Sequence, residues 1–301
     1  MSVVFSFDIG GFVKSRSPER PQSANIGLRL KGDNGCTVIL IHGLTGTPNE
    51  MKSLANFLNR KGYSVVCPRL ANHTEPLRVL KNTTWQDLYG SVRDIFLKEA
   101  DGGGIIFAAG LSVGALLALL LAEEFPDKVA GVTCLAPTLF YDGWNAPNSK
   151  YLLPLGYHTF LKRFFYFKEE PPYGIKNETI QNRVHKYYAN ARLDDMEGVA
   201  QYGYPYFPVT LLHQVHLLAN HIAEKLPDIR CPVQAIQAKD DDTASVRNSK
   251  FIYDGVGSEV KEMVLLYDSY HVITADHQRD VVAQKVESFF SRIMEARKVK
   301  S

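Results

Sequence analysis

The stretch GIIFAAGLSVGALLALLLAEEF, from Gly104 to Phe125, decides the fold. It opens on the apolar run 105–109, which is short and rich in bulky residues, as in a buried strand. It closes on residues 115–125, a Leu- and Ala-rich run without Gly or Pro that is typical of a helix packed against a sheet. We therefore expect a strand, a tight turn and a helix in succession.

The turn between them reads Gly-Leu-Ser-Val-Gly over residues 110–114, a G-x-S-x-G pattern. A serine on such a strand-to-helix turn takes a strained backbone conformation that lifts its hydroxyl off the sheet. The glycines avoid a clash there because neither has a Cβ, and the new helix directs its amides over the serine. The pattern alone also fits a turn with a helix N-cap serine. The flanking strand and helix favour a nucleophile elbow carrying Ser112.

Composition limits the classes of protein to consider. The chain has 301 residues, of which 45% are hydrophobic and 22% charged, as expected for one α/β domain with an insertion. The formal charge of +2 gives no basic field for nucleic acid. The four cysteines are far apart and indicate buried free thiols. Without an 18-residue apolar run or a signal-like leader, we expect no membrane span and a cytoplasmic enzyme.

Strand and helix patterns alternate from residue 36 to 136, which predicts a doubly wound, mostly parallel sheet. We expect strands at 26–30, 36–41, 63–68, 105–109, 129–136, 233–238 and 260–267. We expect helices at 49–61, from about 85 to 97, at 115–125, at 210–224 and from about 279 to 298.

Residues 137–207 have a different character. These 71 residues hold 17 of the 33 aromatic residues, which is more than a connecting loop needs. They form either a small insertion with an aromatic core of its own, or a lid whose aromatic underside lines an apolar substrate pocket, or both. We therefore divide the chain into a core of residues 1–136 and 208–301 and a lid over 137–207.

The strand at 36–41 runs directly into His42-Gly-Leu-Thr-Gly-Thr-Pro48. A glycine-rich loop at this place can turn its backbone amides toward the cleft at the carboxyl edge of the sheet. Together with the elbow, it predicts an oxyanion hole made by the amides of Leu44 and Val113.

An acid and a histidine each follow a later strand. Asp240, Asp241 and Asp242 come just after 233–238, and His271 comes just after 260–267. A serine hydroxyl needs a base within hydrogen-bond reach, and that base needs an acid to orient it. The chain order of serine, aspartate and histidine is the one that α/β-hydrolases use.

Three histidines fall on the expected helix at 210–224: His213, His216 and His221. A metal site would need a carboxylate at matching spacing, and none is there, so they are interpreted as structural. We expect neither a metal nor a cofactor.

Four segments together resemble the bacterial carboxylesterase/monoacylglycerol lipase family of α/β-hydrolases: IHGLTGTPNEM, AGLSVGALLALLLA, AIQAKDDD and YHVITADHQRD. The resemblance covers residues 28 to 292 and is weakest across the lid. In the family pattern Q-A-x-x-D, the acid is Asp241 and not Asp240 or Asp242. The resemblance also implies Leu44 and Val113 as oxyanion donors. The chain departs from the family at LANHTEP, where relatives have a G-H-G-like turn, and in its longer, more aromatic lid.

The sequence thus predicts a serine hydrolase that cleaves short- to medium-chain or monoacylglycerol-like carboxylic esters through an acyl-serine. Ser112, Asp241 and His271 would be catalytic, and a small apolar ester the partner. An acyl-thioesterase is the alternative enzyme, since a thioester presents the same carbonyl. A hydrolase-fold protein that only binds a small apolar ligand is the alternative outside enzymes. Peptide hydrolysis remains open, as does the oligomeric state.

Overall fold

The computed structural model describes residues 2–5, 26–146, 157, 159–191 and 196–300. A seven-stranded sheet with the order β10-β9-β6-β5-β3-β4-β2 runs through its centre. Its strands are β2 (Ile26–Leu30), β3 (Cys36–Ile41), β4 (Ser64–Pro68), β5 (Ile105–Leu111), β6 (Val129–Leu135), β9 (Val233–Ala238) and β10 (Lys261–Leu266). Every pairing is parallel except that of the edge strand β2 with β4. The predicted mostly parallel sheet is confirmed.

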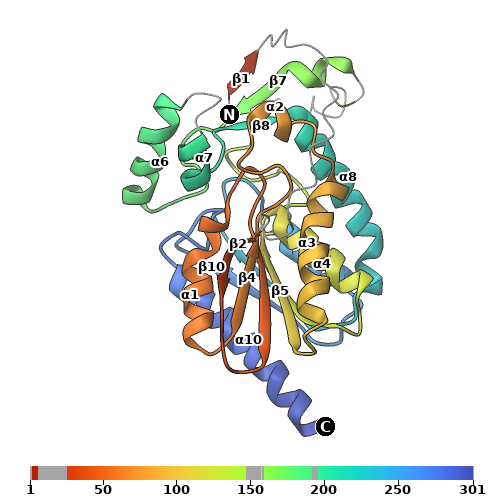
Figure 1. The fold of residues 1–301 in the computed structure, drawn as a ribbon. Coiled ribbons are helices and arrows are strands. Elements are labelled where there is room, and N and C mark those ends of the chain that lie inside the picture. The colour runs from red at the N-terminus through yellow and green to blue at the C-terminus, as the bar shows by residue number, and fades with distance from the viewer. Residues whose placement is uncertain (1, 6–25, 147–156, 158, 192–195, 301) are drawn as a thin grey trace.

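Helices cover both faces of this sheet (Figure 1). One face carries α1 (Lys52–Arg60) and α10 (Arg279–Lys300), and the other carries α3 (Trp85–Ala100), α4 (Val113–Glu124) and α8 (Val209–Lys225). Shorter pieces are η2 (Pro48–Met51), α2 (Leu77–Leu80), η5 (Leu226–Asp228) and α9 (Arg247–Gly255). The helix α9 lies where the sequence pattern predicts none.

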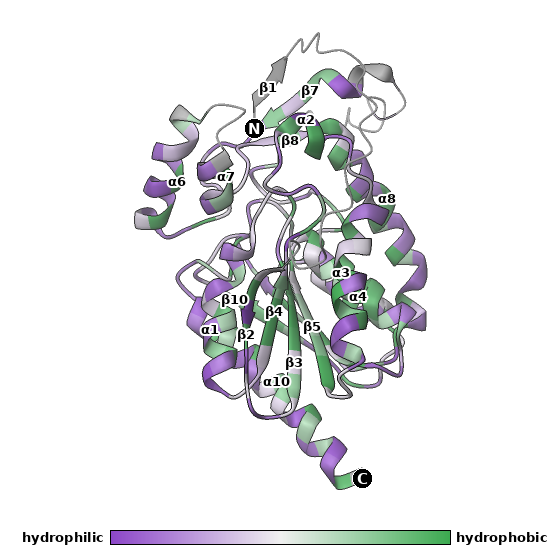
Figure 2. Cartoon of the chain, viewed as in Figure 1, coloured by the Kyte–Doolittle hydropathy of each residue, from purple (hydrophilic) through white to green (hydrophobic). Residues whose placement is uncertain are grey.

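Most residues of the central strands are apolar, as expected where both faces of a sheet are covered. Every residue of β6 is buried, and so is every residue of α4 from Val113 to Ala122. Figure 2 shows the hydrophobic strands at the middle of the molecule and hydrophilic residues along the outer sides of the helices. The strand, turn and helix at 105–124 therefore form the buried centre of the domain.

The order of the strands opens a crevice beside β3. The chain leaves β3 outward to β4 and then returns to β5 on the opposite side of β3. The loops after β3 and β5 consequently diverge at the carboxyl edge of the sheet, which is where ligands bind in open α/β sheets. This crevice receives the loop that begins at His42 and the turn that holds Ser112.

Residues 137–207 are called the insertion segment below, and their described parts lie above that edge (Figure 1). They contain η4 (Phe160–Phe164), β7 (Phe165–Lys168), α6 (Glu178–Asn190), α7 (Met196–Tyr202) and the first part of β8 (Tyr206–Pro208). The strands β7 and β8 pair antiparallel, and the amino-terminal strand β1 (Ser2–Phe5) pairs antiparallel with β7. The first strand of the chain thus joins this small sheet and not the large one.

The insertion segment is held to the core near both of its ends. The amides of Leu139 and Phe140 donate to Oδ1 of Asn248 on α9, at 2.8 and 2.7 Å. At the other end, the Tyr204 amide donates to the carbonyl oxygen of Thr45 at 2.8 Å. Between these points the amides of Lys176 and Asn177 donate to Asp276 of the core at 2.8 Å. A hydrophobic cluster also forms there from Tyr173, Ile175, Val184 and Tyr188, and Val272 of the core packs against it.

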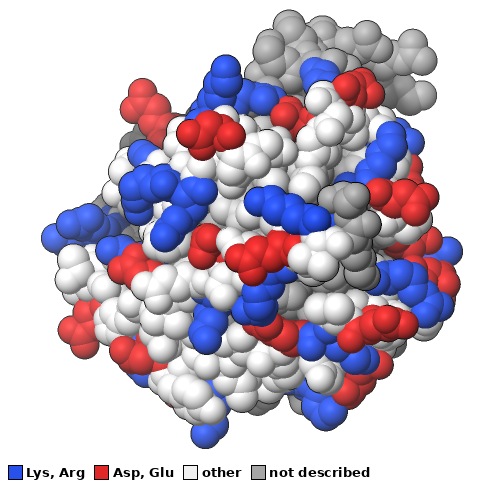
Figure 3. All heavy atoms as spheres, turned by 90° about the horizontal axis from the view of Figure 1, so that it is seen from below, with Lys and Arg blue, Asp and Glu red and all other residues white. Residues whose placement is uncertain are grey.

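Basic and acidic side chains alternate on the face seen in Figure 3, so neither sign dominates it. Within the described residues, no helix has the length and apolarity that crossing a membrane requires.

Candidate active site

The backbone of Ser112 takes the strained conformation that the G-x-S-x-G motif predicts, with φ 57° and ψ −118° at the N-cap of α4. The two glycines of the motif are required by their surroundings. A Cβ on Gly110 would lie 2.0 Å from the carbonyl oxygen of Gly114, and one on Gly114 would lie 2.3 Å from that of Ile41. Because these obstacles are backbone atoms, they cannot rotate away. The close crossing of strand and helix fixes the position of the Ser112 hydroxyl.

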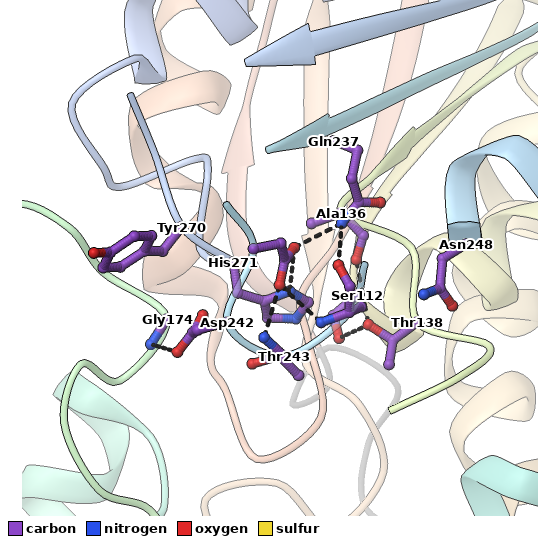
Figure 4. A network of polar contacts seen from close by, with 12 residues as sticks. Ser112, Ala136, Thr138, Gly174, Gln237, Asp242, Thr243, Asn248, Tyr270 and His271 are labelled. Atoms are coloured by element: carbon purple, nitrogen blue, oxygen red, sulfur yellow. Dashed lines mark hydrogen bonds and ion pairs between the residues drawn. The ribbon is translucent and has the colours of Figure 1, made fainter. Parts of the chain in front are cut away.

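His271 and Asp241 are brought together from the ends of β10 and β9. The Nδ1 atom of His271 lies 2.9 Å from Oδ2 and 3.1 Å from Oδ1 of Asp241. The carboxylate also accepts from Nε2 of Gln237 at 2.6 Å and from the amides of Thr243 and Ala244 at 2.9 and 2.8 Å (Figure 4). These contacts hold the carboxylate in one orientation toward the imidazole.

The three neighbouring aspartates have different surroundings. Asp240 is exposed, and Asp242 turns to the amide of Gly174, which donates to its Oδ2 at 3.1 Å. Asp241 is buried and contacts His271. The geometry therefore singles out the aspartate that the family pattern selects.

The charges around His271 adjust its basicity. Burial by itself would lower the pKa of the imidazole, but the Asp241 carboxylate beside it reverses this, with further help from Asp242 and Glu50. The net effect raises the pKa of His271 above its usual value of 6.5. An imidazole with a raised pKa is a better proton acceptor, as a general base requires.

Ser112 and His271 line the same cavity, and the serine hydroxyl has a second neighbour there. Its Oγ lies 3.0 Å from Oγ1 of Thr138, which itself donates to the carbonyl oxygen of Ala136 at 3.3 Å (Figure 4). With the Thr138 hydrogen directed at Ala136, the Ser112 hydroxyl is the donor to Thr138. Catalytic hydrogen bonds often form only once substrate is bound, so this contact describes the resting site.

The two amides expected to bind an oxyanion both lie at this cavity or beside it. Val113 is the first residue of α4, so its amide has no acceptor within the helix. Leu44 lines the cavity on a loop that several side chains hold. His42 donates from Nδ1 to the Gly43 carbonyl oxygen at 2.9 Å and accepts from the Leu70 amide at 3.2 Å. Burial, with His73 nearby, lowers the pKa of His42 well below 6.5, so the ring is neutral.

The cavity encloses about 240 Å³ between the core and the insertion segment. The core contributes the loop after β3, the turn at Ser112 and the loops that carry Asp242 and His271. The insertion segment contributes aliphatic and polar residues together with six aromatic side chains: Tyr141, Phe167, Tyr173, Tyr188, Tyr202 and Phe207. Glu50 and Glu169 also line it.

Three residues of the site have roles that the sequence motifs do not identify. Gln237 is the first residue of the Q-A-x-x-D pattern and Glu50 stands in IHGLTGTPNEM, whereas Thr138 lies in no motif. The role of each is recognisable only from what it contacts. The histidines of α8 lie elsewhere, with His213 stacked on Tyr157 and His221 on Trp85. Among the described residues, no cluster of side chains suited to a metal ion is present.

Comparison with known proteins gives the same fold and places the chain in a family. The sequence pattern of the family described as serine aminopeptidase, S33, matches residues 33–278. The chain is 27% identical to a thermostable monoacylglycerol lipase of Bacillus sp. (strain H-257) over 256 residues, which span 85% of this chain and 90% of that protein. It is 24% identical to a carboxylesterase of Bacillus subtilis (strain 168) over 257 residues, or 85% and 92% of the two chains.

Solved structures agree with this. One of two metagenome-derived lipolytic enzymes, LipS and LipT, superposes with a TM-score of 0.72 at 24% identity, covering 88% of this chain and 96% of its own. The monoacylglycerol lipase of Paleococcus ferrophilus superposes with a TM-score of 0.70 at 18% identity, covering 88% and 98%. At these identities the likeness establishes the α/β-hydrolase fold. The chain therefore belongs to the serine aminopeptidase S33 family and is an α/β-hydrolase of the group that includes carboxylesterases and monoacylglycerol lipases.

Proposed function

We propose that this enzyme hydrolyses carboxylic esters through an acyl intermediate on Ser112. The observation that carries the proposal is the pairing of His271 with Asp241 at the cavity into which the strained Ser112 turn opens. A nucleophile, a base and an acid that orients the base are the set of groups that acyl transfer needs. The names of the Bacillus relatives support esters as the substrate.

In the first step, Ser112 Oγ attacks the ester carbonyl while Nε2 of His271 takes the hydroxyl proton. The hydroxyl must turn from Thr138 to His271 for this. Asp241, on the opposite ring nitrogen, stabilises the imidazolium that forms. The amides of Leu44 and Val113 stabilise the negative charge on the carbonyl oxygen, without reorganisation during the reaction.

In the second step, the tetrahedral intermediate collapses and the C–O bond to the alcohol breaks. His271 returns the proton to the leaving alcohol oxygen, which leaves Ser112 acylated. Water, deprotonated by the same imidazole, then attacks the acyl carbonyl, and the serine departs with the proton from His271. The products are a carboxylic acid and an alcohol, and the enzyme returns to its starting state.

The aromatic wall of the cavity supports a substrate with an apolar part, because each buried methylene contributes about 0.8 kcal/mol. We propose that the insertion segment is the lid over this site and selects short- to medium-chain or monoacylglycerol-like esters. Its side chains line the same cavity as Ser112.

The test is hydrolysis of a series of p-nitrophenyl esters with increasing acyl length by the wild type and by Ser112→Ala. We expect turnover by the wild type and a loss of about 10⁴-fold or more in kcat for the variant, as for removal of a triad nucleophile. A folded wild type that is inert on every ester, or an alanine variant that is as active as the wild type, would reject the proposal. Activity restricted to acyl-thioesters would identify a thioesterase.

A further inference from the structure

The loop after β10 carries His271, and one stretch of the insertion segment lies against it. This stretch is residues 174–177, called the crossing segment below. A Cβ on Gly174, whose φ is +68°, would lie 3.1 Å from Cβ of His271 and 2.9 Å from Cγ2 of Val272. The Val272 amide donates to the carbonyl oxygen of Gly174 at 2.7 Å. The backbone of the crossing segment therefore contacts the loop of His271 directly.

One buried carboxylate joins the two. Asp276 is 1% exposed, and four backbone amides donate to its side chain. Oδ2 accepts from Lys176 and from Tyr270, each at 2.8 Å. Oδ1 accepts from Asn177 at 2.8 Å and from His277 at 2.9 Å. Each oxygen thus binds one amide of the crossing segment and one amide of the loop after β10.

These bonds fix the backbone of His271 from both sides. Tyr270, the residue before it, is bound through its amide to Asp276, and Val272, the residue after it, is bound through its amide to Gly174. Hydrogen bonds to a charged acceptor are roughly twice as strong as those between neutral groups. A base that must reach both an acid and a nucleophile needs such a fixed position.

The side-chain contact between the same two stretches is weaker. Nζ of Lys176 lies 3.1 Å from Oδ1 of Asp268, but the Asp268 side chain is 57% exposed. An exposed ion pair contributes little to stability because water screens it. The buried carboxylate of Asp276 is therefore the stronger link between the crossing segment and the loop.

A role limited to the start of α10 does not account for these bonds. Asp276 lies three residues before that helix, and its carbonyl oxygen accepts from the Arg279 amide at 3.2 Å. Two of the four donors to its side chain come from residues 99 and 100 positions away, which the start of a helix does not require. The side chain instead connects the insertion segment to the loop that bears the histidine.

We propose that Asp276 is a positioning residue for the base of the reaction, holding the loop of His271 and the crossing segment in one arrangement. The inference rests on the proposed ester hydrolysis, in which His271 moves the proton. Asp276 is not among the described residues that line the cavity, so it acts on the reaction through Tyr270 and His271. Its loss should change the rate of the chemical step and not only the stability of the protein.

The first test is hydrolysis of p-nitrophenyl butanoate by Asp276→Asn. Whichever way the new side chain turns, its NH2 group faces one amide of the crossing segment and one of the loop after β10, so a bond to each is lost. We expect kcat to fall by about tenfold or more, because a small displacement of a reacting group lowers the rate steeply. We also expect the acid limb of kcat/KM to move to lower pH.

The pH profile separates positioning from a general loss of stability. Burial lowers the pKa of the imidazole, and Asp241 first, then Asp242 and Glu50, raise it. A ring displaced from Asp241 loses the largest of these opposing contributions, so its pKa falls. The control is Asp87→Asn, which removes a charge from the carboxylate that caps α3 and should keep the wild-type kcat and pH profile. A folded Asp276→Asn with the wild-type kcat, or with a lower kcat and an unchanged pH profile, would overturn the inference.

A second variant distinguishes position from charge. Asp276→Glu keeps the negative charge but places the carboxylate one methylene further from the backbone, so the four amides no longer face it in the same arrangement. We expect kcat and the pH profile to change in the same direction as in the asparagine variant. Wild-type behaviour of Asp276→Glu would contradict the inference, because a charge in this region would then be sufficient. The glutamate variant also decides if Asp276→Asn does not fold.

A measurement without substrate separates this inference from the proposed function. If the wild type and a folded Asp276→Asn hydrolyse the ester equally well, ester hydrolysis stands and the inference fails. If the wild type hydrolyses no ester, the low-field proton NMR signal of the His271 Nδ1–H bonded to Asp241 still tests the inference. Loss or upfield movement of that signal in Asp276→Asn, with the signal retained in Asp87→Asn, supports the positioning role. The same signal in both variants rejects it.

Discussion

The turn at Ser112 and the insertion segment are the two regions that make the cavity, and they are built in opposite ways. The turn accepts only glycine at positions 110 and 114, because a Cβ there would lie 2.0 or 2.3 Å from a backbone carbonyl oxygen. The insertion segment has a small hydrophobic cluster and separate hydrogen bonds to the core, near its two ends and at Lys176 and Asn177. The comparison suggests a division of roles in which the core edge sets the chemistry and the insertion segment sets what is bound. Four predictions test that division, from the largest expected effect to the smallest.

The largest effect is expected at the acid of the core edge. Asp241→Asn keeps the shape of the side chain but removes the charge that orients His271, and we expect kcat to fall by about 10⁴-fold. The measurement is p-nitrophenyl butanoate hydrolysis at pH 8. The exposed neighbour provides the control, and Asp240→Asn should retain wild-type activity. A large loss in the Asp240 variant with little change in the Asp241 variant would reassign the acid.

A pair of glycines compares the stability of the two regions. In Gly110→Ala the new methyl meets the carbonyl oxygen of Gly114 at 2.0 Å, and we expect a loss of about 3 kcal/mol in the free energy of unfolding. In Gly198→Ala the obstacle is the ring of Tyr187, which can move. The helix propensity of alanine also helps there, so we expect a change within about 1 kcal/mol. Urea denaturation measures both, and equal losses would contradict the division between rigid turn and adaptable insertion.

The pH dependence of hydrolysis reports on His271. Only the neutral imidazole acts as base, and the net effect of burial and of Asp241, Asp242 and Glu50 raises its pKa above 6.5. We therefore expect kcat/KM for a neutral ester to decrease on acidification, with an apparent pKa above 6.5. Asp242→Asn removes one of these negative charges and should move the curve to lower pH. A curve centred below 6.5 in the wild type would argue against this role of the carboxylates.

The smallest effect concerns Thr138, where the insertion segment begins. Thr138→Val removes the acceptor that competes with His271 for the Ser112 hydroxyl. The loss of one hydrogen bond of about 1 kcal/mol should speed fluorophosphonate labelling of Ser112 by about fivefold. Thr138→Ser keeps the hydroxyl and should label at the wild-type rate. Slower labelling of the valine variant would show that Thr138 assists the nucleophile and does not restrain it.

The parts of the fold that depend on local rules could be predicted from the sequence. The motif around Ser112 requires glycines because of contacts between adjacent elements, and the apolar runs specify buried strands. The pairing of Asp241 with His271 follows from topology, because both residues come directly after parallel neighbouring strands. The motif, the buried strands and the pairing of Asp241 with His271 can be predicted because they depend only on short-range geometry and on the alternation of strands and helices along the chain.

The parts that depend on distant contacts could not be predicted. The motifs contain Gln237 and Glu50, but their contacts with Asp241 and with the Gly43 amide could not be read from them. The contact of Thr138 with Ser112 likewise depends on how separate elements are placed. The helix α9 was missed because it has only nine residues and two of the three that it buries, Asn248 and Ser249, are polar. The pairing of β1 with β7 joins residues more than 150 positions apart, and residues 6–25 and 147–156 lie outside the described part of the chain.

The attachments of the insertion segment limit how the cavity can open. Near one end Asn248 accepts from two consecutive amides, and near the other Tyr204 is 1% exposed and bonded to Thr45. The middle is bonded to the core as well, because the amides of Lys176 and Asn177 donate to Asp276 at 2.8 Å. A hinge at either end, or a bend at the start of α6, would therefore break one of these sets of contacts. The size of the substrate should then be set by the side chains that line the cavity, on a backbone frame that keeps its path.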